Sequence, residues 1–218
     1  MSSLVLQRST EWIWLNKPSG LPVFPLHQDS DSDCVLRRLL AEAPQQAQGF
    51  APGFEGGIAH RLDTPTSGLL LVARSPQALS KARAAFQGKQ LIKNYRFLSS
   101  APMEPKKCTL EQAIAHHPKN RRKMVVQRNP GSKCRGKWYS AHTRLRHIKG
   151  ALHEAVITTG VMHQIRVHAA FAGAPLLGDT LYGGTPSPDG PDFYLHHAHL
   201  KGLGACPFLP PPGDWSEP

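Results

Sequence analysis

The sequence predicts a mixed α+β domain with a large, mainly antiparallel sheet, and three observations support this fold class. Hydrophobic residues make up 40% of the 218 residues, enough to fill a sizeable core. Several short apolar stretches are separated by polar turns, as in antiparallel strands, and few stretches show helical spacing. Without a composition break or internal repeat, we expect a single domain over residues 11–206, between an N-terminal tail (1–10) and a proline-rich tail (207–218).

In the N-terminal half, local patterns predict two strands and two helices. Residues 11–15 indicate a short buried strand that ends in a turn-forming cluster, and the aliphatic run at 68–73 indicates a second strand. Leucine and valine recur at helical spacing over 33–43. A further helix begins after Ser75, which can cap it, has proline in its first turn and ends near Gly88.

The C-terminal half is predicted to be mostly strands. Residues 91–98 alternate in polarity and predict one strand. Further strand candidates are separated by polar turns and lie at 109–115, 123–127, 140–147 and 152–158. A helix is predicted over 164–172, because apolar residues share one face and Gly173 can end it.

Several protein classes are excluded by simple features of the chain. The longest aliphatic run, Leu69–Ala73, is far shorter than the roughly 20 residues that cross a bilayer. The four cysteines are scattered, without a C-x-x-C pair, so neither a disulfide framework nor a zinc finger is expected. The N-terminus lacks a secretory signal pattern, and we expect a cytoplasmic protein.

The positive charge of the chain is concentrated in one segment. Lysine and arginine exceed aspartate and glutamate by 11 in the whole chain, with 26 basic and 15 acidic residues. Residues 104–149 hold 13 basic and two acidic residues, which accounts for the whole excess. Such a cluster binds polyanions by neutralising phosphates, although a solvated loop would have the same composition. Charge alone therefore favours a nucleic-acid partner without indicating an enzyme.

Three side chains have residue types and surroundings suited to chemistry. Asp63 lies in a polar turn before a buried strand, where a carboxylate can be held rigidly as a nucleophile or base. Tyr95 can offer a ring for stacking against a base, and Arg166 can bind a carboxylate or phosphate with its planar fork. Taken singly, each has an ordinary alternative: a turn cap, a packing residue and a helix-surface arginine.

The order and spacing of the motifs resemble those of the RluA-type pseudouridine synthases. The resemblance extends over roughly residues 11–206. The matching stretches are Asn16-Lys17-Pro18-Ser19-Gly20, His60-Arg61-Leu62-Asp63 with Thr66-Ser67-Gly68, Lys93-x-Tyr95, His163-Gln164-Ile165-Arg166-Val167-His168, Leu177-Gly178-Asp179 and Leu181-Tyr182-Gly183. A single short motif would be weak evidence, but the ordered set is specific.

The resemblance implies a fold, a reaction and a set of catalytic roles. The expected fold is a mixed, mainly antiparallel sheet with a central catalytic cleft, and the expected enzyme converts uridine in RNA to pseudouridine. Asp63 would act on the ribose, while Tyr95 would stack on the flipped uracil and assist removal of its proton. Arg166 would pair with Asp63 and contact a phosphate, and Ile165 and Leu181 would line the uracil pocket.

The resemblance also implies the partner and the cofactor requirement. The substrate would be ribosomal or transfer RNA, with Arg61 filling the space left by the flipped nucleotide. The remaining predicted RNA contacts are Lys119, Arg121, Arg122 and Lys123. We expect a monomer that uses neither a metal nor an organic cofactor and does not bind membranes. Val161 and Met162 depart from the family, which often has arginine and threonine there.

Two other functions were weighed against this one. A catalytically inactive RNA-binding protein on the same scaffold would keep the basic segment, but would not require Asp63, Tyr95 and Arg166 together. A metal-dependent hydrolase would use Asp63 with the histidines of a C-terminal strand edge, His196, His197 and His199.

Overall fold

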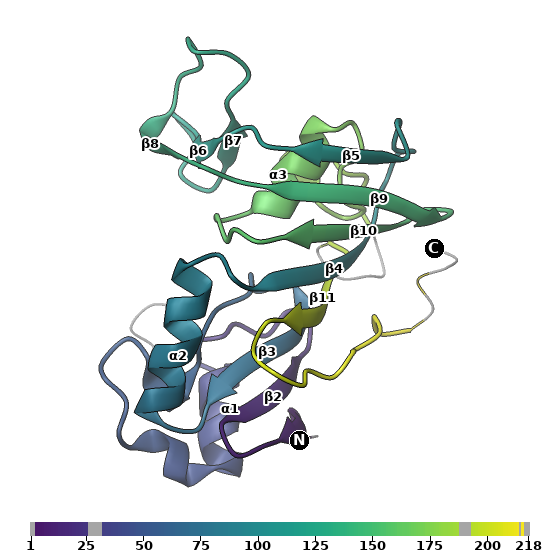
Figure 1. Ribbon diagram of the computed structural model, residues 1–218. Coiled ribbons are helices and arrows are strands. Elements are labelled where there is room, and N and C mark those ends of the chain that lie inside the picture. Colours follow the sequence, from purple (N-terminus) through teal and green to yellow (C-terminus); the bar gives the residue numbers. More distant parts are fainter. Residues whose placement is uncertain (1–2, 26–31, 188–192, 214, 216–218) are drawn as a thin grey trace. The chain divides into compact units, whose positions relative to one another are not determined.

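The computed structural model describes all residues except 1–2, 26–31, 188–192, 214 and 216–218 (Figure 1). The chain divides into two compact units. Unit 1 comprises residues 1–91 with 196–211, and unit 2 comprises residues 92–195 with 212–218. The local sequence around residue 91 shows no change of composition at this boundary. The predicted C-terminal tail lies partly outside the described residues.

In unit 1 the paired strands follow the order β1–β2–β3–β11. Its strands are Val5–Arg8 (β1), Trp12–Lys17 (β2), Ser67–Ala73 (β3) and Leu195–Lys201 (β11). β1 pairs with β2 and β2 with β3 in antiparallel fashion, whereas β11 is parallel to β3. The strand β1 falls inside the segment 1–10, for which local sequence predicted only a tail.

The strand β3 is the centre of unit 1 because both of its faces are covered. All seven of its residues are buried, as expected of an aliphatic strand inside a sheet. The helix α2, Pro76–Gln87, packs along β3 (Figure 1) and is capped by the Ser75 hydroxyl, which accepts from Ala78 N. Its apolar face joins a core that includes Trp12, Trp14 and Leu71. The predictions for this strand and helix are confirmed.

The helix α1, Val35–Glu42, also forms where the sequence predicted it. Residues 44–57, between α1 and β3, contain two short 3-10 turns, Pro44–Ala47 and Glu55–Gly57.

In unit 2 the strands of the main sheet follow the order β4–β10–β9–β5, and every pair is antiparallel. The strands are Ile92–Leu98 (β4), Lys107–Leu110 (β5), Thr143–Lys149 (β9) and Leu152–Ile157 (β10). A smaller sheet has the order β7–β6–β8, with strands Ile114–His116 (β6), Met124–Val126 (β7) and Arg135–Tyr139 (β8). The predicted strand 109–115 is thus two strands in different sheets, and β8 was not predicted.

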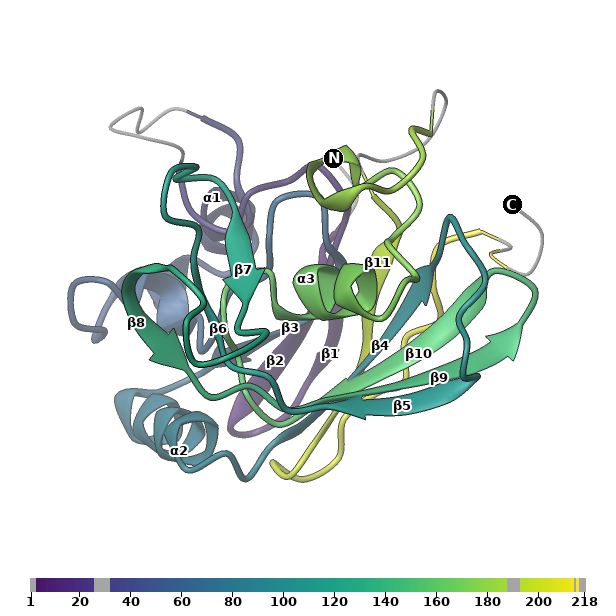
Figure 2. The ribbon, with the colours of Figure 1, turned by 90° about the horizontal axis from the view of Figure 1, so that it is seen from above.

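The helix α3, Gln164–Phe171, lies against β9 on one face of this sheet (Figure 2). The register places Tyr95 opposite Ala155, and Ala155 opposite Leu145. Thr143, two residues before Leu145, bonds side chains of α3, so Tyr95 is on the sheet face that α3 covers. The strands of the described residues, mostly antiparallel, together with the helices α1, α2 and α3 confirm the predicted α+β class.

Gly68 lies where β3 approaches β11 closely, so a substitution at this position tests how the two strands pack. It has φ +114, and a Cβ atom there would lie 2.3 Å from the carbonyl oxygen of His197. We expect Gly68→Ala to lower the free energy of unfolding by more than about 3 kcal/mol, because backbone strain and a clash with backbone add together. The measurement is urea denaturation at pH 7.

Gly53 provides a matched control in the same unit, since its φ is +85 and a Cβ would meet nothing within 4 Å. Gly53→Ala should cost only about 1–2 kcal/mol, the backbone strain alone. Equal losses for the two variants would contradict the close approach of β3 and β11.

Candidate active site

Asp63 lies in a tight turn that leads into β3. The Asp63 carbonyl accepts a hydrogen bond from Thr66 N at 3.0 Å, which closes the turn. Leu62 is buried on one side of Asp63 and Thr66 and Ser67 on the other, while Asp63 itself is half-buried. The carboxylate therefore extends from a backbone that is fixed on both sides.

A buried lysine holds this turn from the side of β2. The ammonium of Lys17 is 0% exposed and donates to the carbonyl oxygens of Pro18, Leu21 and Thr64 at 2.9, 2.6 and 2.8 Å. These three bonds use all three ammonium protons. Burial lowers the pKa of Lys17 to about 8, and the charge of Asp63 opposes part of that shift.

Two further bonds join the segment after Lys17 to the Asp63 turn. Gly20 N donates to the Thr64 carbonyl at 3.0 Å, and the Ser19 hydroxyl donates to the Pro65 carbonyl at 2.6 Å. The sequence predicted a turn at residues 16–20 and matched this stretch to a family motif. Its second function, as a support for the residues next to Asp63, depends on partners about 45 positions away that local patterns do not reveal.

The histidines of β11 are engaged in packing unit 1. His196 bonds the Ser67 hydroxyl through Nδ1 at 2.9 Å and the Leu209 carbonyl through Nε2 at 3.1 Å. His197 Nδ1 bonds the Leu69 carbonyl at 2.7 Å. Burial lowers the pKa of His196 to about 4, so its ring is neutral near pH 7. Among the described residues, no group of three or more His, Cys, Asp or Glu side chains could hold a metal ion.

Arg166, in the first turns of α3, is buried and held by Asp179. Its Nε donates to Asp179 Oδ2 at 2.6 Å and its Nη2 to Oδ1 at 2.8 Å, a bidentate pair in which both side chains are less than 10% exposed. The guanidinium also lies 4.3 Å from the ring centre of Phe193 and 5.0 Å from that of Tyr182. Arg166 is therefore not an ordinary helix-surface arginine. The sequence did not identify Asp179 as its partner.

The loop around Asp179 is shaped by a close backbone approach at Gly184. A Cβ atom on Gly184 would lie 1.9 Å from the Leu176 carbonyl oxygen. Asp179 N donates to that same carbonyl at 3.1 Å, and Gly184 N donates to the Asp179 carbonyl at 2.9 Å. Glycine is required here because any side chain would force this loop open and move the carboxylate that fixes Arg166.

Tyr95 and Lys93 are on the same face of β4, and both are 7% exposed. The Lys93 ammonium donates to the Thr159 carbonyl at 2.6 Å, and burial lowers its pKa to about 8. Of the two predicted pocket residues, Ile165 is buried in α3 and Leu181 is half-buried in the loop that holds Asp179. Unit 2 thus contains Tyr95, Ile165, Arg166 and Leu181, whereas Asp63 and the exposed Arg61 belong to unit 1.

The other predicted RNA-binding residues occupy the connection between β6 and β7. His117 N donates to the Lys123 carbonyl at 2.9 Å, and His117 Nδ1 accepts from the backbone of Lys119 and Asn120. This ordered turn exposes the side chains of Lys119, Arg121 and Arg122. Lys123 differs from them because it is half-buried, with its ammonium 5.5 Å from the centre of the Tyr182 ring.

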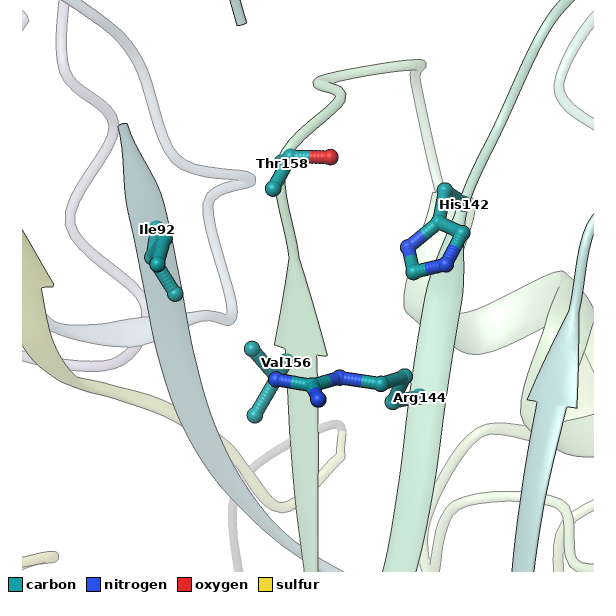
Figure 3. A pocket seen from close by; sticks show the side chains of 5 residues that line it. All are labelled: Ile92, His142, Arg144, Val156 and Thr158. Atoms are coloured by element: carbon teal, nitrogen blue, oxygen red, sulfur yellow. The ribbon is translucent and has the colours of Figure 1, made fainter. Parts of the chain in front are cut away.

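A hollow of 220 Å³ lies on the other face of the unit 2 sheet (Figure 3). In the antiparallel register, Val156 is opposite Arg144 and Asn94, so its side chain is on the face opposite Tyr95. Figure 3 shows the Arg144 guanidinium lying across Val156. The hollow is lined by Ile92, His142, Arg144, Val156 and Thr158, none of which was predicted as a site residue.

Within the described part of the chain, each helix is too short or too polar to span a bilayer.

Replacing Lys17 should show how far the Asp63 turn depends on it. Lys17→Met leaves the carbonyl groups of Pro18, Leu21 and Thr64 without this donor, and each such loss costs about 1–3 kcal/mol. We expect the free energy of unfolding to fall by roughly 3 kcal/mol or more in urea denaturation at pH 7. Lys81→Met, at an exposed lysine paired with Glu11, should change it by less than about 1 kcal/mol. Similar stabilities for the two variants would contradict the role given to Lys17.

Comparison with known proteins gives a consistent result. Residues 11–171 match the family model described as RNA pseudouridylate synthase. The chain is 34% identical over 184 residues to "Ribosomal large subunit pseudouridine synthase D" of Haemophilus ducreyi, a match that covers 84% of this chain and 54% of the relative. It is 33% identical over 190 residues to the protein of the same name from Escherichia coli, covering 84% and 53%. The chain thus spans about half the length of these curated relatives.

Solved structures show the same fold. "Human RNA Pseudouridylate Synthase Domain Containing 4" aligns with a TM-score of 0.70 at 21% identity, covering 90% of this chain and 82% of that one. "Human RNA Pseudouridylate Synthase Domain Containing 1" aligns with a TM-score of 0.69 at 24% identity, covering 90% and 76%. The family match extends over most of the chain and confirms the resemblance drawn from the motifs: this chain belongs to the RNA pseudouridylate synthase family.

Proposed function

We propose that the chain isomerises uridine to pseudouridine within RNA, without a metal or an organic cofactor. The observation that carries this proposal is the family match over residues 11–171, which includes Asp63, Tyr95 and Arg166. The relatives named above are described as ribosomal large subunit synthases. Large-subunit ribosomal RNA is therefore the first substrate to test, and transfer RNA the second.

The reaction exchanges one bond to the ribose for another. The N1–C1′ bond of uridine breaks, the uracil turns, and a C5–C1′ bond forms. The proton on C5 leaves, and N1 gains a proton, so that atoms balance without an added reactant. The Asp63 carboxylate acts on the ribose, as a nucleophile or as a base. Its support by Lys17 favours either role, because a rigid backbone holds the carboxylate in place without reorganisation.

The remaining roles follow from the properties of each side chain. Arg166 uses Nε and Nη2 for Asp179, and we propose that its guanidinium also pairs with Asp63 and contacts a phosphate. Tyr95 stacks on the uracil that has left the RNA stack and assists removal of the C5 proton, and Arg61 fills the space the uracil leaves. Ile165 and Leu181 supply apolar contacts to the uracil.

The exposed turn between β6 and β7 binds the RNA backbone. Its side chains lie in the segment that accounts for the whole charge excess of the chain. Val161, which stands where the family often has an arginine that would contact phosphate, is half-buried. This substitution favours a second candidate function, RNA binding without catalysis, which the first experiment below distinguishes.

Asp63→Asn should abolish turnover while leaving RNA binding intact. The amide has nearly the same shape as the carboxylate but cannot act as a nucleophile or base, so the rate should fall by at least about 100-fold. The measurement is tritium release from RNA labelled at C5 of uridine, taken from cells that lack the protein. Asp33→Asn, at an exposed carboxylate paired with Arg38, is the matched control and should keep wild-type release. RNA binding by the wild type without release from any RNA would favour the non-catalytic candidate.

Replacing Lys119, Arg121 and Arg122 together with glutamine should weaken RNA binding and reduce its salt dependence. Each lost phosphate contact lowers the slope of log K against log salt by about 0.7–0.9. We expect a smaller slope by about 2 in filter binding between 50 and 200 mM salt. The same change at Lys81, Lys89 and Lys201, which are exposed in unit 1, should leave the slope unchanged. An unaltered slope in the first variant would exclude this turn from the RNA interface.

A further inference from the structure

The side-chain amide of Gln164, the first residue of α3, is buried and fully hydrogen-bonded. Its Oε1 accepts from the Thr159 hydroxyl at 2.9 Å and from Val161 N at 3.1 Å. Its Nε2 donates to the His142 carbonyl and to Thr143 Oγ1, both at 2.9 Å. The four bonds match the two lone pairs and two protons of an amide.

The partners allow only one orientation of this amide. The backbone N–H of Val161 can only donate, and the carbonyl of His142 can only accept, so the oxygen and nitrogen of Gln164 cannot be exchanged. Gln164 therefore links the end of β10 to the start of β9, and does so with a fixed direction for each bond.

The chain of directed bonds continues along the same face of α3. Thr143 Oγ1 accepts from Gln164 and can give its one proton to His168 Nδ1, at 2.8 Å. His168 Nε2 then carries the proton that it donates to the Gln112 carbonyl at 3.0 Å. Burial lowers the pKa of His168, and the bond to Gln112 partly offsets this, which agrees with a neutral ring. Gln164 and His168 are four residues apart, so both ends of one helix face are held.

The start of α3 needs such support because its backbone begins in a strained conformation. His163, at the N-cap, has φ 55 in the left-handed region, and its Nδ1 bonds the Tyr182 hydroxyl at 2.9 Å. An N-cap side chain usually fixes the first turn, but here the side chain of Gln164 binds Val161 N just before the helix.

We propose that Gln164 is a positioning residue for Arg166. Asp179 fixes the guanidinium at its end, and Gln164 fixes the helix from which Arg166 extends two residues later. The role requires the directed network and not merely a polar group that fills space. This inference rests on the proposed function, because positioning is measured through turnover.

Gln164→Glu replaces the donor that faces the His142 carbonyl and Thr143 with an acceptor, at nearly constant shape. We expect kcat for tritium release to fall by about 100-fold, with KM changed by less than about threefold, because a small displacement of a catalytic group affects the reacting state more than RNA binding. Thr143→Val removes the next hydroxyl in the network without adding a buried charge, and should also lower kcat. Thr143→Ser, which keeps the hydroxyl, should restore it.

A control distinguishes positioning from general stability. Ser99→Ala removes a buried hydroxyl of unit 2 that bonds the Ala101 carbonyl and lies outside the Gln164 network. It should lower Tm while kcat per folded molecule stays at the wild-type value. If the Gln164→Glu or Thr143→Val protein is folded and has the wild-type kcat, the positioning role of Gln164 is overturned but the proposed function is not. A wild type that releases no tritium would overturn it together with the proposed function.

Discussion

The buried bidentate pair of Arg166 and Asp179 is the interaction on which the arrangement of unit 2 depends. Removing two charges from water is costly, and the pair is favourable only if both partners are held in good geometry. Both partners of the pair are held in place by their surroundings. Gly184 permits the tight loop that places Asp179, and Gln164 fixes the helix that bears Arg166. An arginine held in this way has little conformational freedom left to lose when a ligand binds to it.

Unit 1 also contains a buried charged group, but this group is a lysine that binds carbonyl groups and not a member of an ion pair. Lys17 is fully buried, and its ammonium is satisfied by the Pro18 and Leu21 carbonyls and by the Thr64 carbonyl of the turn that contains Asp63. Lys93 in unit 2 holds the Thr159 carbonyl in the same manner. Burial lowers the pKa of both lysines, and both of them hold loops at the ends of strands. The family motifs therefore contain residues that position the backbone as well as residues expected to touch RNA.

The sequence predicted well those parts of the fold that local patterns determine. The aliphatic strand β3, the Ser75 cap of α2 and the extent of α3 all follow from short-range signals. β1 and β8 were missed because they are short, mostly exposed strands stabilised by pairing with neighbours. The support of Asp63 by Lys17 and the partner of Arg166 were missed for the same reason, since both depend on contacts between distant residues. The roles of Asp63, Tyr95 and Arg166 came from the motif series and not from residue patterns alone.

The proposed function requires that this chain make pseudouridine in cellular RNA through Asp63. The most direct measurement is carbodiimide primer extension across ribosomal and transfer RNA from cells with the protein, without it, and with only its Asp63→Asn form. We expect at least one modified uridine that is present in the first strain and absent from the other two. Identical maps in all three strains, with the protein folded and expressed, would contradict it.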